Sequence, residues 1–163
     1  MEKKYKLTEE TIKVEGSILY RIEALQDFAD VKRGDKGGYV EKEENLSQSG
    51  DCWIYGNAMV YGKAQVCGDA MVCGDALVCD DAMVYGDALV CDDAMVYGDA
   101  QIYNDAIVYG NAESYGNVYV YGSAKVLGFA KVYGNAIVHD NAKIYGDAEV
   151  YGDAIVCGNA KVC

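Results

Sequence analysis

One aliphatic side chain recurs every six residues from Ile54 to Val162, with no insertion in between. Only Ser114 interrupts this column. The residue two places before each member is Ala, apart from Cys52 at the start and Val118. Gly usually stands two places after the aliphatic residue, and Asp or Asn comes next, so the unit is Ala-x-Val-Tyr-Gly-Asp. A period of six fits neither the roughly 3.6 residues of a helical turn nor a single hairpin, and it indicates a repeat architecture.

Each unit is interpreted as a short strand followed by a corner. In a strand, Ala and the aliphatic residue point to one side, while x and Tyr point to the other. Gly accepts a positive φ, and Asp or Asn tolerates the left-handed region, so the Gly-Asp pair suits a tight corner. Short strands joined by identical corners must coil. We therefore predict a β-solenoid whose narrow interior is filled by the Ala and Val side chains.

This pattern resembles the hexapeptide repeat of left-handed β-helices, in which three hexads form one 18-residue triangular coil. The segment before the repeats, YRIEALQDFADVKRGDKGG, and the first repeat, WIYGNA, are similar to those of poorly characterised bacterial and phage β-helix proteins, often labelled transferases by analogy. One departure is that Gly follows the Tyr column instead of the aliphatic residue. The resemblance implies an all-β chain: a single-stranded left-handed triangular β-helix of roughly six to seven coils with an N-terminal β-hairpin cap.

The chain divides into a capping segment, residues 1–39, and a β-helix of hexapeptide repeats, residues 40–163. In the first segment apolar and polar residues alternate around Glu15-Gly16, which predicts the hairpin. A polar terminal segment of different sequence is what a solenoid needs to cover an open end.

The charge balance limits the partners of this chain. Its 163 residues hold 14 Lys and Arg against 26 Asp and Glu, a net charge of −12. Direct binding to nucleic acid or to an anionic membrane surface would therefore work against repulsion. There is neither a signal peptide nor an apolar run of ~18 residues, so we expect a cytoplasmic protein in a bacterial host or a phage-infected cell. Seven cysteines without a close pair predict neither a disulfide framework nor a zinc knuckle, and no cofactor is expected.

If residues n and n+18 stack, the outward side chains form three faces. One of them, which we call the uncharged face, carries no formal charge apart from a His proton: Gln65, Cys67, Met83, Tyr85, Gln101, Tyr103, Tyr119, Tyr121, Ile137, His139, Ile155 and Cys157. It offers roughly 400 Å² of apolar and aromatic surface, a size at which a patch on a monomer needs a reason. The alternative is that the Tyr residues only stabilise the solenoid by stacking.

We predict that the uncharged face is a homo-oligomer interface, formed by Met83, Tyr85, Gln101, Tyr103, Tyr119, Tyr121, Ile137 and Ile155. A second, half-apolar face would be its partner surface, through Met71, Leu89 and Ile107 together with Trp53. A trimer in which each subunit contributes two faces buries more area than a dimer, so we favour a trimer.

The middle of the repeat region is strongly acidic, with no Lys or Arg between Lys63 and Lys125. Corner carboxylates such as Asp69, Asp87 and Asp105 fall into one ladder, which is compatible with a Ca²⁺ site or with a mimic of DNA phosphates. The simpler interpretation is that Asp suits a corner and keeps the protein soluble. We favour this last interpretation and predict no metal site.

The one histidine, His139, stands in the Tyr column, and Cys157 is its neighbour 18 residues on. The two are candidates for a thiol–imidazole pair. The resemblance adds that hexapeptide acyltransferases use a His at a subunit boundary to activate a hydroxyl or an amine. We expect no third group to orient His139 here, so the interpretation as a substitute for Tyr in the ladder is preferred.

The sequence therefore predicts a non-catalytic, self-associating β-helix that binds a protein partner whose identity the sequence does not give. The resemblance suggests an inhibitor or adaptor of host machinery in a phage or a mobile element. Two alternatives stay open: a hexapeptide-type acyltransferase, and an acidic DNA-mimic inhibitor of a DNA-binding protein.

Overall fold

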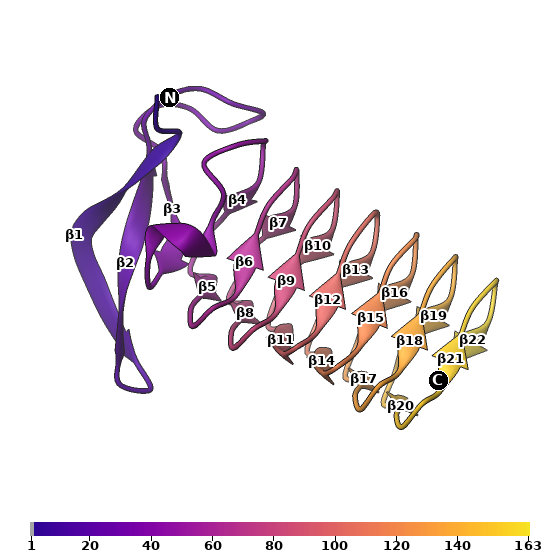
Figure 1. Ribbon diagram of the computed structural model, residues 1–163. Helices are drawn as coiled ribbons and strands as arrows, with labels where there is room; N and C mark the ends of the chain where they lie inside the picture. Colours follow the sequence, from indigo (N-terminus) through magenta and orange to yellow (C-terminus); the bar gives the residue numbers. More distant parts are fainter. Residues whose placement is uncertain (1) are drawn as a thin grey trace.

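The computed structural model describes residues 2–163 and is a stack of about seven coils with a hairpin at its N-terminal end (Figure 1). The all-β prediction is confirmed, because the described residues contain strands and one short 3-10 turn, η1 (Glu43–Asn45), but no α-helix. No helix in residues 2–163 is long and apolar enough to cross a membrane.

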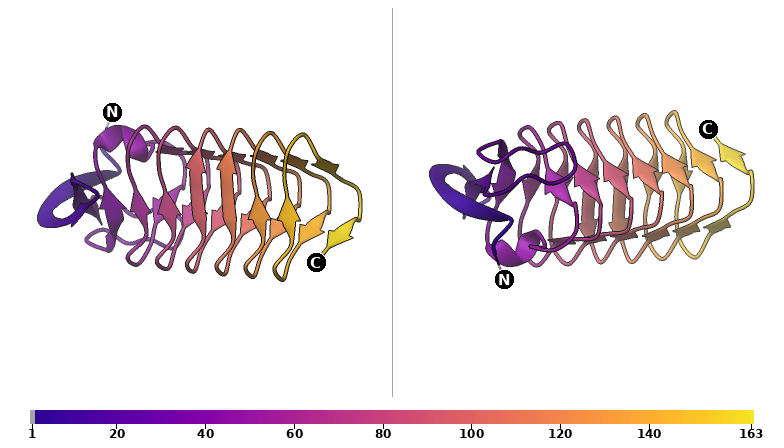
Figure 2. Two further views of the ribbon diagram at one scale, coloured as in Figure 1. Left: turned by 90° about the horizontal axis from the view of Figure 1, so that it is seen from below. Right: turned by 90° about the horizontal axis from the view of Figure 1, so that it is seen from above.

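Three sheets run along the stack, and successive coils add one strand to each (Figure 2). The long sheet has the order β1 (Tyr5–Val14), β2 (Ser17–Ala24), β3 (Lys36–Val40), β5 (Met59–Val60), β8 (Leu77–Val78), β11 (Met95–Gly98), β14 (Glu113–Gly116), β17 (Lys131–Val132) and β20 (Glu149–Val150). The seven-stranded sheet contains β4 (Trp53–Ile54), β7 (Met71–Val72), β10 (Leu89–Val90), β13 (Ile107–Val108), β16 (Lys125–Val126), β19 (Lys143–Ile144) and β22 (Lys161–Val162). The six-stranded sheet contains β6 (Gln65–Val66), β9 (Met83–Val84), β12 (Gln101–Ile102), β15 (Tyr119–Val120), β18 (Ile137–Val138) and β21 (Ile155–Val156).

The register of the coils is 18 residues, as the resemblance to hexapeptide β-helices implies. Leu89 pairs with Ile107, and Ile107 pairs with Lys125, in parallel strands. Each x residue therefore lies beside the x residue of the next coil, and the three expected faces are the outer sides of the three sheets. The left-handed winding and the triangular cross-section stay predictions.

The corners explain the Gly column. Gly98 has a φ of 70°, and a Cβ on it would come within 2.8 Å of the Gly116 nitrogen in the next coil. Four corners lack Gly at this position, and their residues adopt the left-handed conformation instead, with φ between 57° and 61°: Asp80, Asp92, Asn104 and Asp140. These are the residue types that tolerate that region best.

The core is the stack of Ala and aliphatic columns, which are fully buried through most of the solenoid. Burying one Val side chain contributes about 1.5–3 kcal/mol, so the column is the main source of stability. Ser114 interrupts it and is itself fully buried. Among the described residues its hydroxyl is the one buried side-chain oxygen or nitrogen without a hydrogen-bond partner.

The predicted N-terminal hairpin is confirmed: β1 and β2 are antiparallel and turn at Glu15 and Gly16. β3 pairs with β2 on one side and, in parallel, with β5 on the other. The hairpin therefore continues the long sheet and lies over the first coils (Figure 1).

The N-terminal segment also covers Trp53. The rings of Tyr5 and Phe28 lie 6.1 and 5.3 Å from its indole ring, both edge to face, and only 1% of Trp53 is exposed. The prediction that Trp53 belongs to an exposed second face is therefore wrong. Met71, Leu89 and Ile107 remain on the outer side of the seven-stranded sheet.

Candidate functional site

The uncharged face is the outer side of the six-stranded sheet. The rings of Tyr85, Tyr103, Tyr121 and His139 form one stack along it, with centroids 4.8, 4.9 and 5.0 Å apart. The predicted interface residues on this sheet are half-buried by their own neighbours, except Ile155, which is 61% exposed.

A second aromatic stack lies on the long sheet and joins Tyr97, Tyr115, Tyr133 and Tyr151, with centroids 4.8 to 5.5 Å apart. This sheet also carries charges, since Glu113 and Lys131 form an ion pair at 3.3 Å. Tyrosine stacking thus accompanies both a charged and an uncharged face. The ladders stabilise the solenoid, and the absence of charge is what distinguishes the uncharged face.

His139 closes the first stack and meets two further reactive groups. Its Nδ1 lies 3.2 Å from Oδ1 of Asp140. Cys157 follows one coil later, and the ligand atoms of His139, Asp140 and Cys157 all lie within 4.8 Å of one another. Asp140 is therefore a third group close to His139, where the sequence led us to expect none.

The corner conformation places Asp140 beside the imidazole. Asp140 occupies the position usually taken by Gly, with a φ of 60°, and its Oδ2 accepts the backbone N–H of Gly158 at 3.0 Å. The Gly158 N–H and the contact with His139 together lower the pKa of the Asp140 carboxyl. Asp140 is therefore an anion at neutral pH, held by the next coil.

Asp80 is a structural twin of Asp140 without a histidine. It has the same φ of 60°, and its Oδ2 accepts the N–H of Gly98 at 3.1 Å. The residue before it is Cys79 instead of His. A comparison of Asp80 with Asp140 therefore distinguishes the structural role of a carboxylate at this corner from any effect that it has on His139.

This cluster supports two kinds of chemistry. A carboxylate beside Nδ1 favours the tautomer in which Nε2 has a free lone pair, which is the form a general base needs. A set of one N, one O and one S donor is also of the kind that binds Zn²⁺ with an open position. Sequence reasoning named His139 and Cys157 but missed Asp140, although its place in the Gly column was visible.

The cysteines differ sharply in their environments. Burial raises the pKa of the Cys79 thiol to about 11, and burial together with the neighbouring Cys73 raises that of Cys91 to about 12. Both are protonated at neutral pH and serve as packing groups. Cys157 is exposed, beside an imidazole.

The corner aspartates Asp69, Asp87 and Asp105 are exposed. Asp69 uses its Oδ1 to accept the backbone N–H of Asp51 at 3.0 Å, a contact between coils. Within residues 2–163, the His139 cluster is the only group that brings three potential metal ligands together, so the structure does not gather these aspartates.

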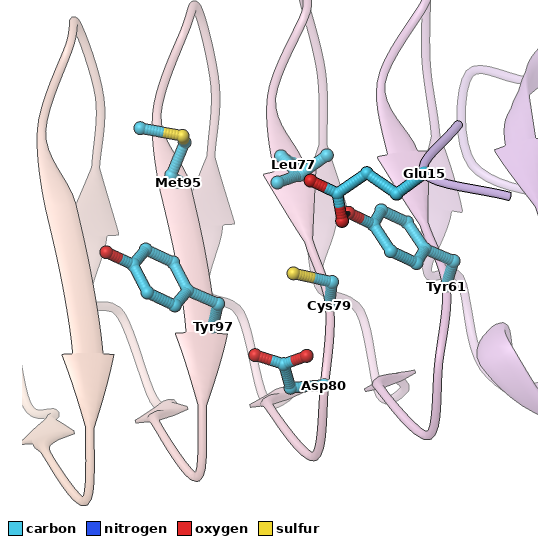
Figure 3. A pocket seen from close by; sticks show the side chains of 7 residues that line it. All are labelled: Glu15, Tyr61, Leu77, Cys79, Asp80, Met95 and Tyr97. Atoms are coloured by element: carbon cyan, nitrogen blue, oxygen red, sulfur yellow. Dashed lines mark hydrogen bonds between the residues drawn. The ribbon is translucent and has the colours of Figure 1, made fainter. Parts of the chain in front are cut away.

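A groove of about 270 Å³ lies where the long sheet's ladder is broken (Figure 3). Cys79 stands there between Tyr61 and Tyr97, in the place of a tyrosine ring. Glu15 reaches in from the hairpin turn and accepts the Tyr61 hydroxyl at 3.2 Å. None of the predicted site residues lines this groove, and the Cys in the Tyr column was its only signal in the sequence.

Comparison with known proteins agrees with the repeat. The YdcK β-solenoid repeat model matches residues 54–64, 64–80 and 100–112. The uncharacterized acetyltransferase YdcK of Escherichia coli K12 is 39% identical over a 61-residue alignment, which covers 32% of this chain and 19% of that protein. The match thus spans about a fifth of the relative's length. Over these residues the chain is similar to the YdcK β-solenoid repeat, and as a whole it resembles the hexapeptide-repeat β-helix proteins.

Proposed function

We propose that the protein transfers an acyl group from a thioester to a hydroxyl or an amine, with His139 as the general base. The observation that carries the proposal is the contact of 3.2 Å between His139 Nδ1 and Asp140 Oδ1 on an exposed corner. The similarity to a protein named as an acetyltransferase supports the choice of reaction.

The proposed step uses the free Nε2 of His139. This nitrogen takes the proton of the acceptor O–H or N–H while the acceptor atom attacks the thioester carbonyl carbon. The C–S bond of the tetrahedral intermediate then breaks, and the leaving thiolate takes the proton back from Nε2. Asp140 stabilises the imidazolium that exists between the two proton transfers.

The test is the release of thiol from an acetyl thioester, with water, amines and sugar hydroxyls as acceptors. We expect His139→Gln to lower the rate about a hundredfold or more, in line with the loss of a general base. Asp140→Asn should lower the rate as well, whereas its structural twin, Asp80→Asn, should leave it unchanged. Cys157→Ser should retain activity, because the step does not pass through the thiol.

Two results would contradict this proposal. One is thiol release by His139→Gln at the rate of the wild type. The other is an equal loss of rate in Asp140→Asn and Asp80→Asn, which would assign both carboxylates to the fold alone.

Self-association is a second proposal, favoured by the lack of charged side chains on the uncharged face. That face carries the His139 cluster, so a second copy bound there would provide a wall for an otherwise open site. Binding of a protein partner, including a phage adaptor role, would use the same face. A DNA mimic has less support, since the acidic stretch ends where Lys125 begins a row of lysines.

A further inference from the structure

Three lysines stack directly on one another at the C-terminal end of the seven-stranded sheet. Lys125 pairs in register with Lys143, and Lys143 pairs with Lys161. Adjacent coils are ~4.8 Å apart, so the three side chains leave the sheet as one row. The chain has only four Lys or Arg residues after Lys63, and three of them are in this row.

This row is electrostatically unfavourable on its own. Like charges directly opposite each other in a sheet are destabilising. Among residues 2–163, no carboxylate lies within ion-pair distance of Lys125, Lys143 or Lys161, although seven contacts between a Lys or Arg and a carboxylate occur elsewhere. The cost of repulsion is therefore not offset by any acidic partner in the described chain.

The long sheet arranges its charges differently in the same coils. At the equivalent positions of the same coils it places Glu113, Lys131 and Glu149, which alternate in sign. Lys131 is 3.3 Å from Glu113 there. Strand positions of the solenoid can therefore carry charges of alternating sign as well as charges of one sign. The geometry of the fold does not by itself explain the row of three lysines.

The corner beside the row is also unusual. At the position where Asp is common, the three corners carry Ser123, Asn141 and Asn159, all exposed and uncharged. Together with the lysines they line a surface depression of about 420 Å³. Ammonium groups, a hydroxyl and amide groups all donate hydrogen bonds, and no side chain in the lining carries a negative charge.

We propose that this depression binds a short chain of linked phosphates. Charges spaced along a line match a row of three lysines, whereas a single phosphate cannot reach all three. A long polyanion such as DNA would extend over the acidic corners of a chain with a net charge of −12. A diphosphate or triphosphate stays within the row.

The site is distinct from the proposed acyl-transfer site. His139 leaves the six-stranded sheet on one side of the corner, and Lys143 leaves the seven-stranded sheet on the other. The inference does not depend on acyl transfer, and its test measures binding only.

The test is calorimetric titration of the full chain with inorganic triphosphate at low ionic strength, because salt screens exposed charges. We expect triphosphate to bind more tightly than diphosphate, and diphosphate more tightly than orthophosphate. Lys143→Gln removes the central ammonium and should weaken triphosphate binding about tenfold or more. Lys63→Gln makes the same change in net charge far from the row and should leave the affinity unchanged.

Thermal unfolding gives a second measurement. Without ligand, Lys143→Gln should melt at a higher temperature than the wild type because it relieves repulsion, and Lys63→Gln should not. Triphosphate should raise the melting temperature of the wild type by mass action. Absence of triphosphate binding would overturn the proposal, and so would equal weakening of triphosphate binding in both variants.

ATP provides a further comparison. It should bind no more tightly than inorganic triphosphate, since no aromatic side chain lines the depression. Binding of ATP without binding of inorganic triphosphate would also overturn the proposal.

Discussion

At the scale of single residues, Ser114 is the one polar residue in the buried aliphatic column. Its hydroxyl is buried in the aliphatic column without a partner, and an unsatisfied buried hydroxyl costs about 1–3 kcal/mol. Val118, which replaces an Ala of the inward column in the same coil, is also fully buried and adds volume to the interior. Removing the hydroxyl should therefore stabilise the chain without overfilling the interior.

We predict that Ser114→Ala raises the free energy of unfolding by about 1 kcal/mol. Chemical denaturation followed by circular dichroism measures this change. Ser123→Ala, at an exposed corner, is the matched control and should have an effect near zero. A loss of stability in Ser114→Ala would mean that the hydroxyl has a partner in solution, such as a buried water.

At the same scale, Asp140 shows what periodicity does not reveal. The repeat identified its position as a corner, but periodicity does not show the contacts that its carboxylate makes with His139 and with the Gly158 N–H of the next coil. The consensus of a repeat hides the substitutions at single positions. A side chain with a possible chemical role that replaces Gly at one corner is therefore easily taken for an irregularity of the repeat.

At the scale of elements, the strands and corners were predictable because each hexad repeats the same strand residues followed by the same corner residues. The uncharged face and the 18-residue register follow from that period together with the three hexads per coil that the resemblance to hexapeptide β-helices implies. The covering of Trp53 was not predictable, since Tyr5 and Phe28 precede the repeat and approach it through a fold without periodicity. The groove beside Cys79 was missed for a similar reason, because Glu15 reaches it from the hairpin turn.

The hairpin supplies a pH-dependent prediction. The carboxylate of Glu10 in β1 lies 2.8 Å from Lys36 Nζ in β3 and 2.8 Å from Arg21 Nε in β2. Both hydrogen bonds lower the pKa of the Glu10 carboxyl, and the bond from Lys36 has the larger effect. A lowered pKa in the folded state adds stability that is present above the unfolded pKa. That stability is lost as the pH falls through the folded pKa.

We therefore expect Glu10→Gln to melt at a lower temperature than the wild type at neutral pH. The difference should begin to shrink once the pH falls below about 4.3, the ordinary pKa of a Glu carboxyl, and disappear below the lower pKa of the folded state. Thermal unfolding across this pH range is the measurement, and Glu9→Gln, an exposed neighbour that makes neither contact, is the control. A difference that does not change with pH would assign the effect to packing.

At the scale of the whole molecule, the three sides of the solenoid have different chemistry on one backbone. The long sheet carries alternating charge and the hairpin, and the seven-stranded sheet changes from apolar at Met71 to basic at Lys125. Only the six-stranded sheet stays uncharged from end to end. A second copy that binds on this side therefore encounters no charged strand side chains that would repel it or lose their hydration. The proposed assembly rests on this difference between the sheets.

The proposed assembly is a trimer built on the uncharged face. Two apolar patches of ~400 Å² bury roughly 800 Å², less than the ~1,200 Å² usual for a stable pair. A trimer uses two faces of each subunit, and the apolar end of the seven-stranded sheet, at Met71, Leu89 and Ile107, is the available second surface. Burying an unpaired charge against an apolar surface is costly, so charges placed at the centre of the patch should dissociate the assembly.

Light scattering tests this assembly with two matched double variants. Met83→Lys with Tyr103→Lys places two charges on the uncharged face, one from each of two adjacent coils. Leu77→Lys with Tyr97→Lys also introduces two lysines at the same positions of the hexads, but on the long sheet. We expect the wild type and the long-sheet variant at about three times 17.6 kDa and the uncharged-face variant at the mass of one chain. A wild type of single-chain mass, or equal masses for the two double variants, would exclude the uncharged face as the interface.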